Sequence, residues 1–152
     1  MSLIAIGLAA SLSLAAVPAD AEEKAVLATT QAFFDGLEAG DPAAMRAAAL
    51  PNIPMMALST KSDGTVDVRR FASEDSFGKK VAPGLKEWMW SPVVARRGAL
   101  ATVTGPFEIT RDGKTVHCGV NVFTLAKIEG AWKVASVSWT AEPEACPELR
   151  KR

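Results

Sequence analysis

The stretch HCGVNVFTLAKIEGAWKVASVSW, residues 117–139, predicts two long antiparallel strands joined at Glu129-Gly130. Apolar and polar residues alternate on both sides of this dipeptide, as in half-buried strands around a tight turn. Upstream, Asp112-Gly113 is a second hairpin signal. The second half of the chain is therefore expected to be a meander. Its strands are predicted over residues 86–96, 99–110, 114–128 and 131–141, with a bulge or bend at Gly105-Pro106.

The first half of the chain predicts helices. Apolar residues recur every three or four positions over residues 22–40, and Gly40 ends that helix. Asp41-Pro42 supplies the capping residue and the N-terminal proline of a short second helix. A short strand is expected over residues 55–59 and a third helix over residues 66–81. Helices followed by a strand meander predict an α+β fold, with the helices on one face of an antiparallel sheet.

Length and charge limit the possible functions. The chain has 152 residues, enough for one domain with a core. Its 17 basic and 17 acidic residues cancel, and they form no long block of one sign. Nucleic-acid binding is therefore not expected, because it requires a basic surface.

The N-terminus has the pattern of a secretory signal peptide. An apolar run over residues 3–17 precedes Ala19-Asp20-Ala21, which is a cleavage-site pattern. The run is short for a membrane span, so no span is expected after cleavage. The alternative is an apolar helix of the core. The predicted organisation is a signal peptide (1–21), one domain (22–146) and a solvated basic tail (147–152), in a periplasmic or secreted protein.

Export would place Cys118 and Cys146 in an oxidising compartment, where they could form a disulfide. The sequence leaves this open, because the geometry of the bridge cannot be read from it. Two cysteines and the single histidine, His117, are too few for a structural zinc site, and no glycine-rich phosphate loop is present. No metal or cofactor is expected.

Counting outward from the two turns predicts which residues share a face of the sheet. Without bulges, Asn121 lies opposite Ser138 and beside Thr104, and His117 lies beside Glu108. Phe123 flanks this polar row, so this face has the mixture of apolar walls and few polar groups that ligand pockets have. The opposite face would carry Val120, Val122, Val137 and Trp139.

That opposite face has no polar interruption. A single-layer sheet with such a face needs cover, and a second copy of the chain is the simplest cover. The sequence therefore predicts a homodimer formed through the outer face of the sheet.

Several short motifs, in this order and spacing, resemble the nuclear transport factor 2-like superfamily. They are LEAGDP at residues 37–42, ALATV at 99–103, DGK at 112–114, HCGV at 117–120, GAWKV at 130–134 and SWT at 138–140. The chain is most similar to the branch of small polyketide cyclases and ketosteroid isomerases, among members without an assigned function.

The resemblance implies a cone-shaped domain, in which a curved sheet wraps about three N-terminal helices and encloses an apolar pocket. It also implies that a residue of the first helix reaches the pocket, which makes Phe33 and Leu37 candidates. Asn121 falls about where the isomerases carry a pocket carboxylic acid. Members are often dimers.

His117 is the candidate for proton transfer, with Glu108 as the group that orients it and raises its pKa. Cys118 cannot be its partner, because adjacent strand residues point to opposite faces. The chain has no tyrosine. The phenol-plus-acid oxyanion hole of the isomerases and the chemistry of tyrosine-dependent dehydratases are therefore not expected.

Three functions follow from these observations. The first is an exported domain that binds a small apolar molecule through Asn121, Thr104 and Ser138. The second is an isomerase, hydratase or cyclase that uses His117 and Glu108. The third is a non-catalytic module that dimerises through its sheet.

Overall fold

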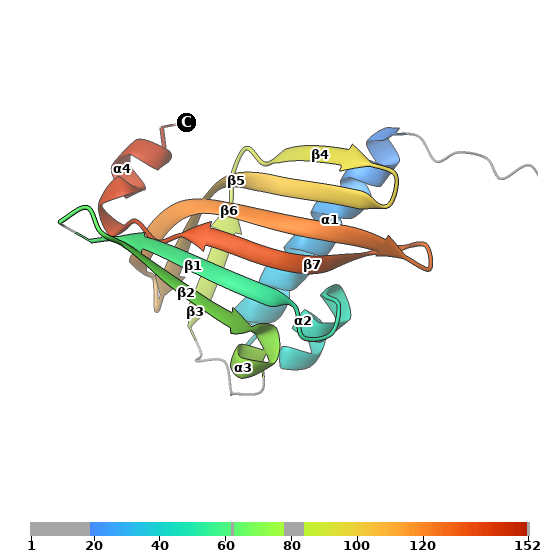
Figure 1. The fold of residues 1–152 in the computed structure, drawn as a ribbon, viewed down its shortest axis with the longest axis horizontal. Helices are drawn as coiled ribbons and strands as arrows, with labels where there is room; N and C mark the ends of the chain where they lie inside the picture. The colour runs from blue at the N-terminus through green and yellow to red at the C-terminus, as the bar shows by residue number, and fades with distance from the viewer. Residues whose placement is uncertain (1–18, 62, 78–83, 152) are drawn as a thin grey trace, which may run out of the picture.

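The structure, a computed structural model, describes residues 19–61, 63–77 and 84–151 (Figure 1). The helices are α1 (Ala19–Glu38), α2 (Pro42–Ala48), α3 (Ser73–Phe77) and α4 (Cys146–Leu149), the last preceded by a short 3₁₀ turn. The strands are β1 (Pro54–Thr60), β2 (Val66–Ala72), β3 (Leu85–Met89), β4 (Val93–Arg97), β5 (Leu100–Arg111), β6 (Lys114–Ile128) and β7 (Ala131–Thr140).

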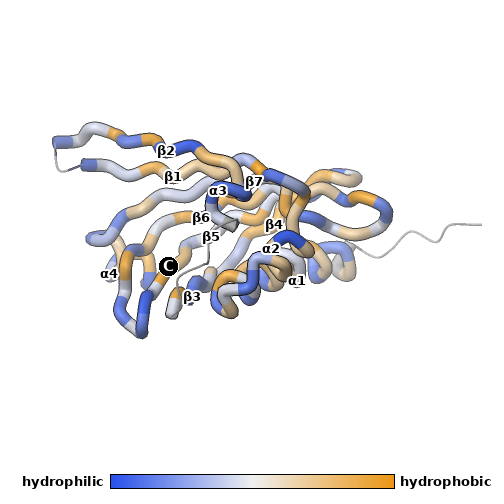
Figure 2. The backbone as a smooth tube through the Cα atoms, turned by 90° about the horizontal axis from the view of Figure 1, so that it is seen from below, coloured by the Kyte–Doolittle hydropathy of each residue, from blue (hydrophilic) through white to orange (hydrophobic). Residues whose placement is uncertain are grey.

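The seven strands form one curved sheet in the order β2-β1-β7-β6-β5-β3, with β4 also paired to β5. Figure 2 shows the sheet curling from β1 and β2 round to β3, with α1 and α2 against its concave side. The predicted α+β class is confirmed. The sheet is mixed rather than wholly antiparallel, because β1 runs parallel to β7.

The two predicted hairpins are present. Asp112 and Gly113 have φ of 50° and 75°, and Glu129 and Gly130 have φ of 50° and 84°. Two successive positive φ angles give the twist that a two-residue hairpin needs, and Gly reaches them without strain. These turns fix Arg111 opposite Lys114, and Ile128 opposite Ala131.

The core lies between α1 and the concave face of the sheet. Phe123 of β6 packs edge-on against Phe33 and Phe34 of α1, with ring centroids 5.8 and 5.4 Å away. α2 is capped by Asp41, whose side chain accepts the backbone N–H groups of Ala43 and Ala44. These contacts fix both helices on the concave side, so that among the described residues the convex side carries only the short C-terminal helix α4 and the 3₁₀ turn before it (Figure 1).

Residues 66–81 are not a helix as predicted. Residues 66–72 form strand β2 on the edge of β1, and only residues 73–77 are helical; residues 78–81 lie outside the described part of the chain. In this segment Arg69 and Phe71 line the concave side, whereas Val66 and Val68 are exposed. The side chains therefore alternate between the two faces with the two-residue period of a strand.

The predicted strand over residues 86–96 is two strands. β3 pairs with residues 107–111 of β5, and β4 pairs with residues 100–104. Pro106 lies in the gap between these pairings, where its missing N–H interrupts no ladder. The irregularity expected at Gly105-Pro106 lies on the β3–β4 side of β5, where residues 90–92 stand against residues 105–106, whereas the β5–β6 register runs through both residues without a shift.

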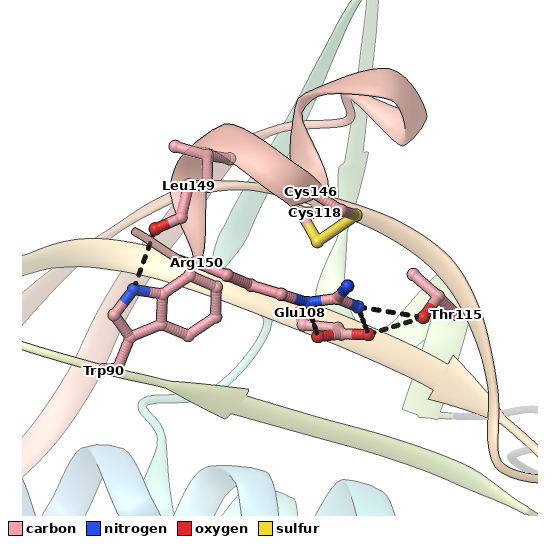
Figure 3. The surroundings of a disulfide bond; sticks show 7 residues. All are labelled: Trp90, Glu108, Thr115, Cys118, Cys146, Leu149 and Arg150. Atoms are coloured by element: carbon pink, nitrogen blue, oxygen red, sulfur yellow. Dashed lines mark hydrogen bonds and ion pairs between the residues drawn. A yellow bond between two sulfur atoms is a disulfide. The ribbon is translucent and has the colours of Figure 1, made fainter. Parts of the chain in front are cut away.

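The C-terminal segment is held on the convex side of the sheet (Figure 3). A disulfide joins Cys118 of β6 to Cys146, with an S–S distance of 2.12 Å. The indole of Trp90 donates to the carbonyl of Leu149, and Arg150 Nε donates to Glu108 Oε2 at 2.9 Å. The prediction of a solvated tail is therefore wrong for Leu149, which is buried, and for Arg150, which is ion-paired.

None of the helices in the described part of the chain has the length and hydropathy of a membrane-spanning segment. The proposed signal peptide lies mostly in residues 1–18, outside the described residues, and α1 already begins at Ala19.

Candidate functional site

A cavity of about 530 Å³ lies between the helices and the concave face of the sheet. Its volume is within the range of roughly 300–1,000 Å³ that small-molecule sites have. Most of its walls are apolar, and they include Phe33, Leu37, Phe107, Phe123, Val137 and Trp139. Of the residues predicted to line a pocket, Phe33, Leu37, Phe123 and Asn121 lie here, and so does His117.

The polar centre of the cavity is the pair of buried Asn121 and half-buried Glu87. Asn121 is only 1% exposed, and its Nδ2 donates to Glu87 Oε1 at 2.7 Å. Glu87 belongs to β3 and stands opposite Ile109, whereas Asn121 stands opposite Gly105. The two residues are therefore four positions apart along β5, and the curvature of the sheet brings them together.

Burial raises the pKa of Glu87 to about 7, and the hydrogen bond from Asn121 lowers it by a smaller amount. The apolar walls disfavour a carboxylate more than one amide N–H stabilises it. At neutral pH this carboxyl group is therefore divided between its acid and its carboxylate, so it can both donate and accept protons.

His117 also faces the cavity, with its ring edge-on to Phe107 at 5.6 Å between centroids. Burial lowers its pKa, which favours the neutral ring at pH 7. Its Nε2 is buried and has no hydrogen-bond partner among the described residues. A ligand that donates a hydrogen bond to Nε2, or accepts one from it, would supply the missing partner.

Glu108 does not lie beside His117 as predicted. It stands opposite Cys118 on the convex side, where it accepts hydrogen bonds from Arg150 and Thr115. The guanidinium of Arg150 lowers the pKa of Glu108, so this group remains a carboxylate. Its role is to hold the C-terminal segment, and it does not reach the cavity.

The predicted polar row is also wrong. Asn121 stands opposite Gly105 and Trp139, whereas Thr104 and Ser138 both stand opposite Val122. Thr104 and Ser138 therefore lie on the convex face and do not line the cavity.

Two register shifts cause this difference. One lies between Thr124 and Leu125 in the β6–β7 pair, and the other between Ile109 and Thr110 in the β5–β6 pair. One extra residue in a strand reverses the face of every residue beyond it. The same shifts place Val137 and Trp139 in the cavity rather than on the outer face.

Glu87, which sequence reasoning missed, had a recognisable signal. In β3 it alternates with Leu85 and Met89, so it occupies an apolar position of a strand. A carboxyl group at such a position is either paired or functional. The long predicted strand over residues 86–96 concealed this, because its partner on β5 was not known.

Two arginines complete the lining. Arg69 of β2 and Arg111 at the end of β5 both border the cavity and are exposed to solvent, which places them at its rim. Asp75 is also at the rim, and its carboxylate accepts the N–H of Ala72 at 3.2 Å. Among the described residues, no three histidine, cysteine or acidic side chains are grouped as metal ligands.

No protein-family model and no curated protein matches the sequence. Solved structures match the fold. An NTF2-like protein of unknown function from Shewanella baltica has a TM-score of 0.61 at 16% identity, and the match covers 85% of this chain and 100% of that one.

Two further structures agree. A protein of unknown function with a cystatin-like fold from Nostoc punctiforme has a TM-score of 0.65 at 12% identity, covering 82% of this chain and 93% of that one. A proposed dehydratase of the NTF2-like family from Streptomyces avermitilis has a TM-score of 0.63 at 16% identity, covering 80% and 96%. The chain therefore has the nuclear transport factor 2-like fold, as the motifs in its sequence predicted.

Proposed function

We propose that this chain binds a small, largely apolar molecule in the cavity. The observation that carries the proposal is the pair of buried Asn121 and half-buried Glu87 within walls that are otherwise mostly apolar. The side-chain amide of Asn121 donates one hydrogen bond to Glu87, and no described residue donates a hydrogen bond to its amide oxygen. That oxygen can accept a hydrogen bond from a hydroxyl group of a ligand.

The test uses a neutral apolar probe, decan-1-ol, at about pH 6, where Glu87 is mostly protonated. Calorimetry should detect binding to the wild type. Asn121→Leu should weaken binding by about 1–3 kcal/mol, because the hydroxyl group would lose its partner in a dry site. Thr104→Val, on the convex face, is the matched control and should leave affinity unchanged. Absence of binding, or equal loss in both variants, would reject the proposal.

A second candidate is acid–base catalysis, and the pKa of Glu87 near 7 favours it. A base of this pKa inside an apolar cavity suits proton abstraction next to a carbonyl group. His117 would then bind or protonate the carbonyl oxygen. This replaces the predicted pair of His117 and Glu108, since Glu108 lies on the other side of the sheet.

This candidate is tested with decan-2-one in D₂O. Wild-type protein should accelerate deuterium exchange at the carbons next to the carbonyl, as followed by NMR, and Glu87→Gln should abolish the acceleration. His117→Gln should reduce it. Binding of the ketone with no exchange above that of Glu87→Gln would leave binding alone as the function.

The proposed setting is the periplasm or the extracellular space. The apolar run with its cleavage pattern supports export, and so does the disulfide, since such bonds persist in oxidising compartments. Cleavage after Ala21 would leave Glu22 at the N-terminus. Glu22 accepts hydrogen bonds from Lys127 at 2.6 Å and Trp132 at 2.9 Å. N-terminal sequencing of exported protein should begin at Glu22, and a chain that retains Met1 would contradict export.

The proposed assembly is a homodimer through the convex face of the sheet. That face carries Val93 and Val122, which are 63% and 40% exposed, and no long helix of the described residues covers it. Val137 and Trp139 no longer belong to it. If the cavity binds nothing, dimerisation through this face becomes the remaining candidate function.

A further inference from the structure

We propose that the ligand is an apolar monocarboxylate, with its chain in the cavity and its carboxylate bound by Arg69 and Arg111 at the rim. The inference deepens the proposed binding function and rests on it.

The two arginines lie on strands that are far apart in the sheet order, β2 at one edge and β5 next to the other edge, and yet both border one cavity. Each is two residues from an apolar lining residue of its own strand, Phe71 and Ile109 respectively. Residues two apart in a strand share a face, so both side chains leave the concave side of the sheet. A molecule that enters the cavity therefore passes two cations.

Neither arginine has a counter-charge in the described part of the chain. Among the described residues no ion pair or hydrogen bond involves the guanidinium of Arg69 or of Arg111, whereas Arg46 and Arg150 are both paired with carboxylates. Asp75 is the rim's own carboxylate, and it accepts a backbone N–H instead. Guanidinium groups bind carboxylates through two parallel hydrogen bonds, so these two are free to take the head of a ligand.

Arg69 is also positioned by the cavity wall. Its guanidinium lies over the ring of Phe71, 5.2 Å from the centroid, and that ring packs edge-on against Trp139 at 5.9 Å. Phe71 and Trp139 both line the cavity. A cation held over an aromatic wall lies at the boundary between water and the apolar interior, which is where the head of an amphiphile would be.

The experiment compares decanoate with decan-1-ol, which share a chain and differ in the head group, at about pH 6. A free carboxyl group, with an ordinary pKa of about 4, is ionised there. Wild-type protein should bind decanoate about tenfold or more tightly than decan-1-ol, because hydrogen bonds to charged groups contribute that much. Arg69→Gln and Arg111→Gln should each reduce this preference, because they should weaken binding of decanoate more than binding of decan-1-ol.

Arg97→Gln is the matched control, since Arg97 is exposed on β4 and does not line the cavity. Equal affinities for the two probes would overturn the inference while the proposed binding function stands. A preference for decanoate that survives both rim substitutions, or is lost equally in Arg97→Gln, would overturn it as well. Failure of both probes to bind would reject the binding function itself.

Discussion

A carboxyl group with a pKa of about 7 changes its charge in the physiological range, and Glu87 does so in the interior of this protein. In the unfolded chain the same group titrates near 4.5. Between these two values the folded protein holds a proton that the unfolded chain has released. Stability must therefore fall as the pH rises from 4.5 to 7 and then level off, as linkage requires.

Glu87→Gln should remove this loss. A separation of about 2.5 pH units, at about 1.4 kcal/mol per unit, makes the variant more stable than the wild type by about 3 kcal/mol at pH 8. At pH 5 the difference should shrink to less than about 1 kcal/mol. Urea unfolding at both pH values measures this, and a constant difference between the two proteins across the range would contradict a raised pKa.

His117 changes the pH dependence of stability in the opposite direction to Glu87. Its lowered pKa means that stability is lost as the pH falls through its unfolded value of 6.5, because the unfolded chain then binds the proton first. The two effects overlap near neutral pH. The comparison of wild type with Glu87→Gln should therefore be repeated in a His117→Gln background, where the difference due to Glu87 should be unchanged.

At the residue scale, the sequence predicted Asn121, Phe33, Leu37, Phe123 and His117 as cavity residues but misplaced Thr104 and Ser138. Each of the correct residues was inferred either from the family resemblance or from its own strand. Thr104 and Ser138 were placed by counting across two hairpins, and one bulge in each pair reversed their faces. Bulges depend on how β6 bends over the core, which no local sequence signal records.

At the scale of elements, the C-terminal segment is fixed to the convex side of the sheet by a disulfide, an indole hydrogen bond and an ion pair. The disulfide should contribute about 3.6 kcal/mol, since it closes a loop of 28 residues. Cys146→Ser should lower the free energy of unfolding by that amount. Reduced wild type should match the variant, and equal stability of oxidised and reduced wild type would contradict a structural role.

The ion pair between Arg150 and Glu108 leads to a separate prediction. Arg150→Gln should destabilise the protein by about 1–3 kcal/mol, because buried Glu108 would lose its charged partner. Adding Glu108→Gln should recover most of the loss, as a double-mutant cycle would measure. The effect of Arg150→Gln should vanish in acid, since the lowered pKa of Glu108 means that its contribution disappears as the pH falls through that value. A loss that is independent of pH would instead indicate packing.

The elements predicted best were those with strong local signals, the two glycine turns and the capped helix α2. The prediction from sequence was wrong at residues 66–72, which were expected to be helical and form a strand. β2 is an edge strand that owes its conformation to pairing with β1, seven residue pairs along. Such tertiary pairing overrides local propensity.

At the scale of the whole molecule, the proposed homodimer depends on the convex face of the sheet. Val122→Glu should convert a dimer into monomers in light scattering and leave the circular dichroism unchanged, because it would place a charge in the middle of the interface. Ile128→Glu is the matched control. Ile128 is 47% exposed at the β6–β7 hairpin, and its substitution should leave the dimer intact. A wild type that is monomeric at high concentration would contradict the prediction.

The disulfide also determines how the molecule carries a mechanical load. A pulling force applied to the two ends of the chain passes from Cys146 directly to Cys118, so β7 and most of β6 lie inside a covalent ring that the force does not stretch. The ring holds back 28 residue steps, or about 100 Å of contour length at about 3.5 Å per residue. Optical tweezers should record a full unfolding extension shorter by this amount in the oxidised protein than in Cys146→Ser. Equal extensions would mean that the bond is absent.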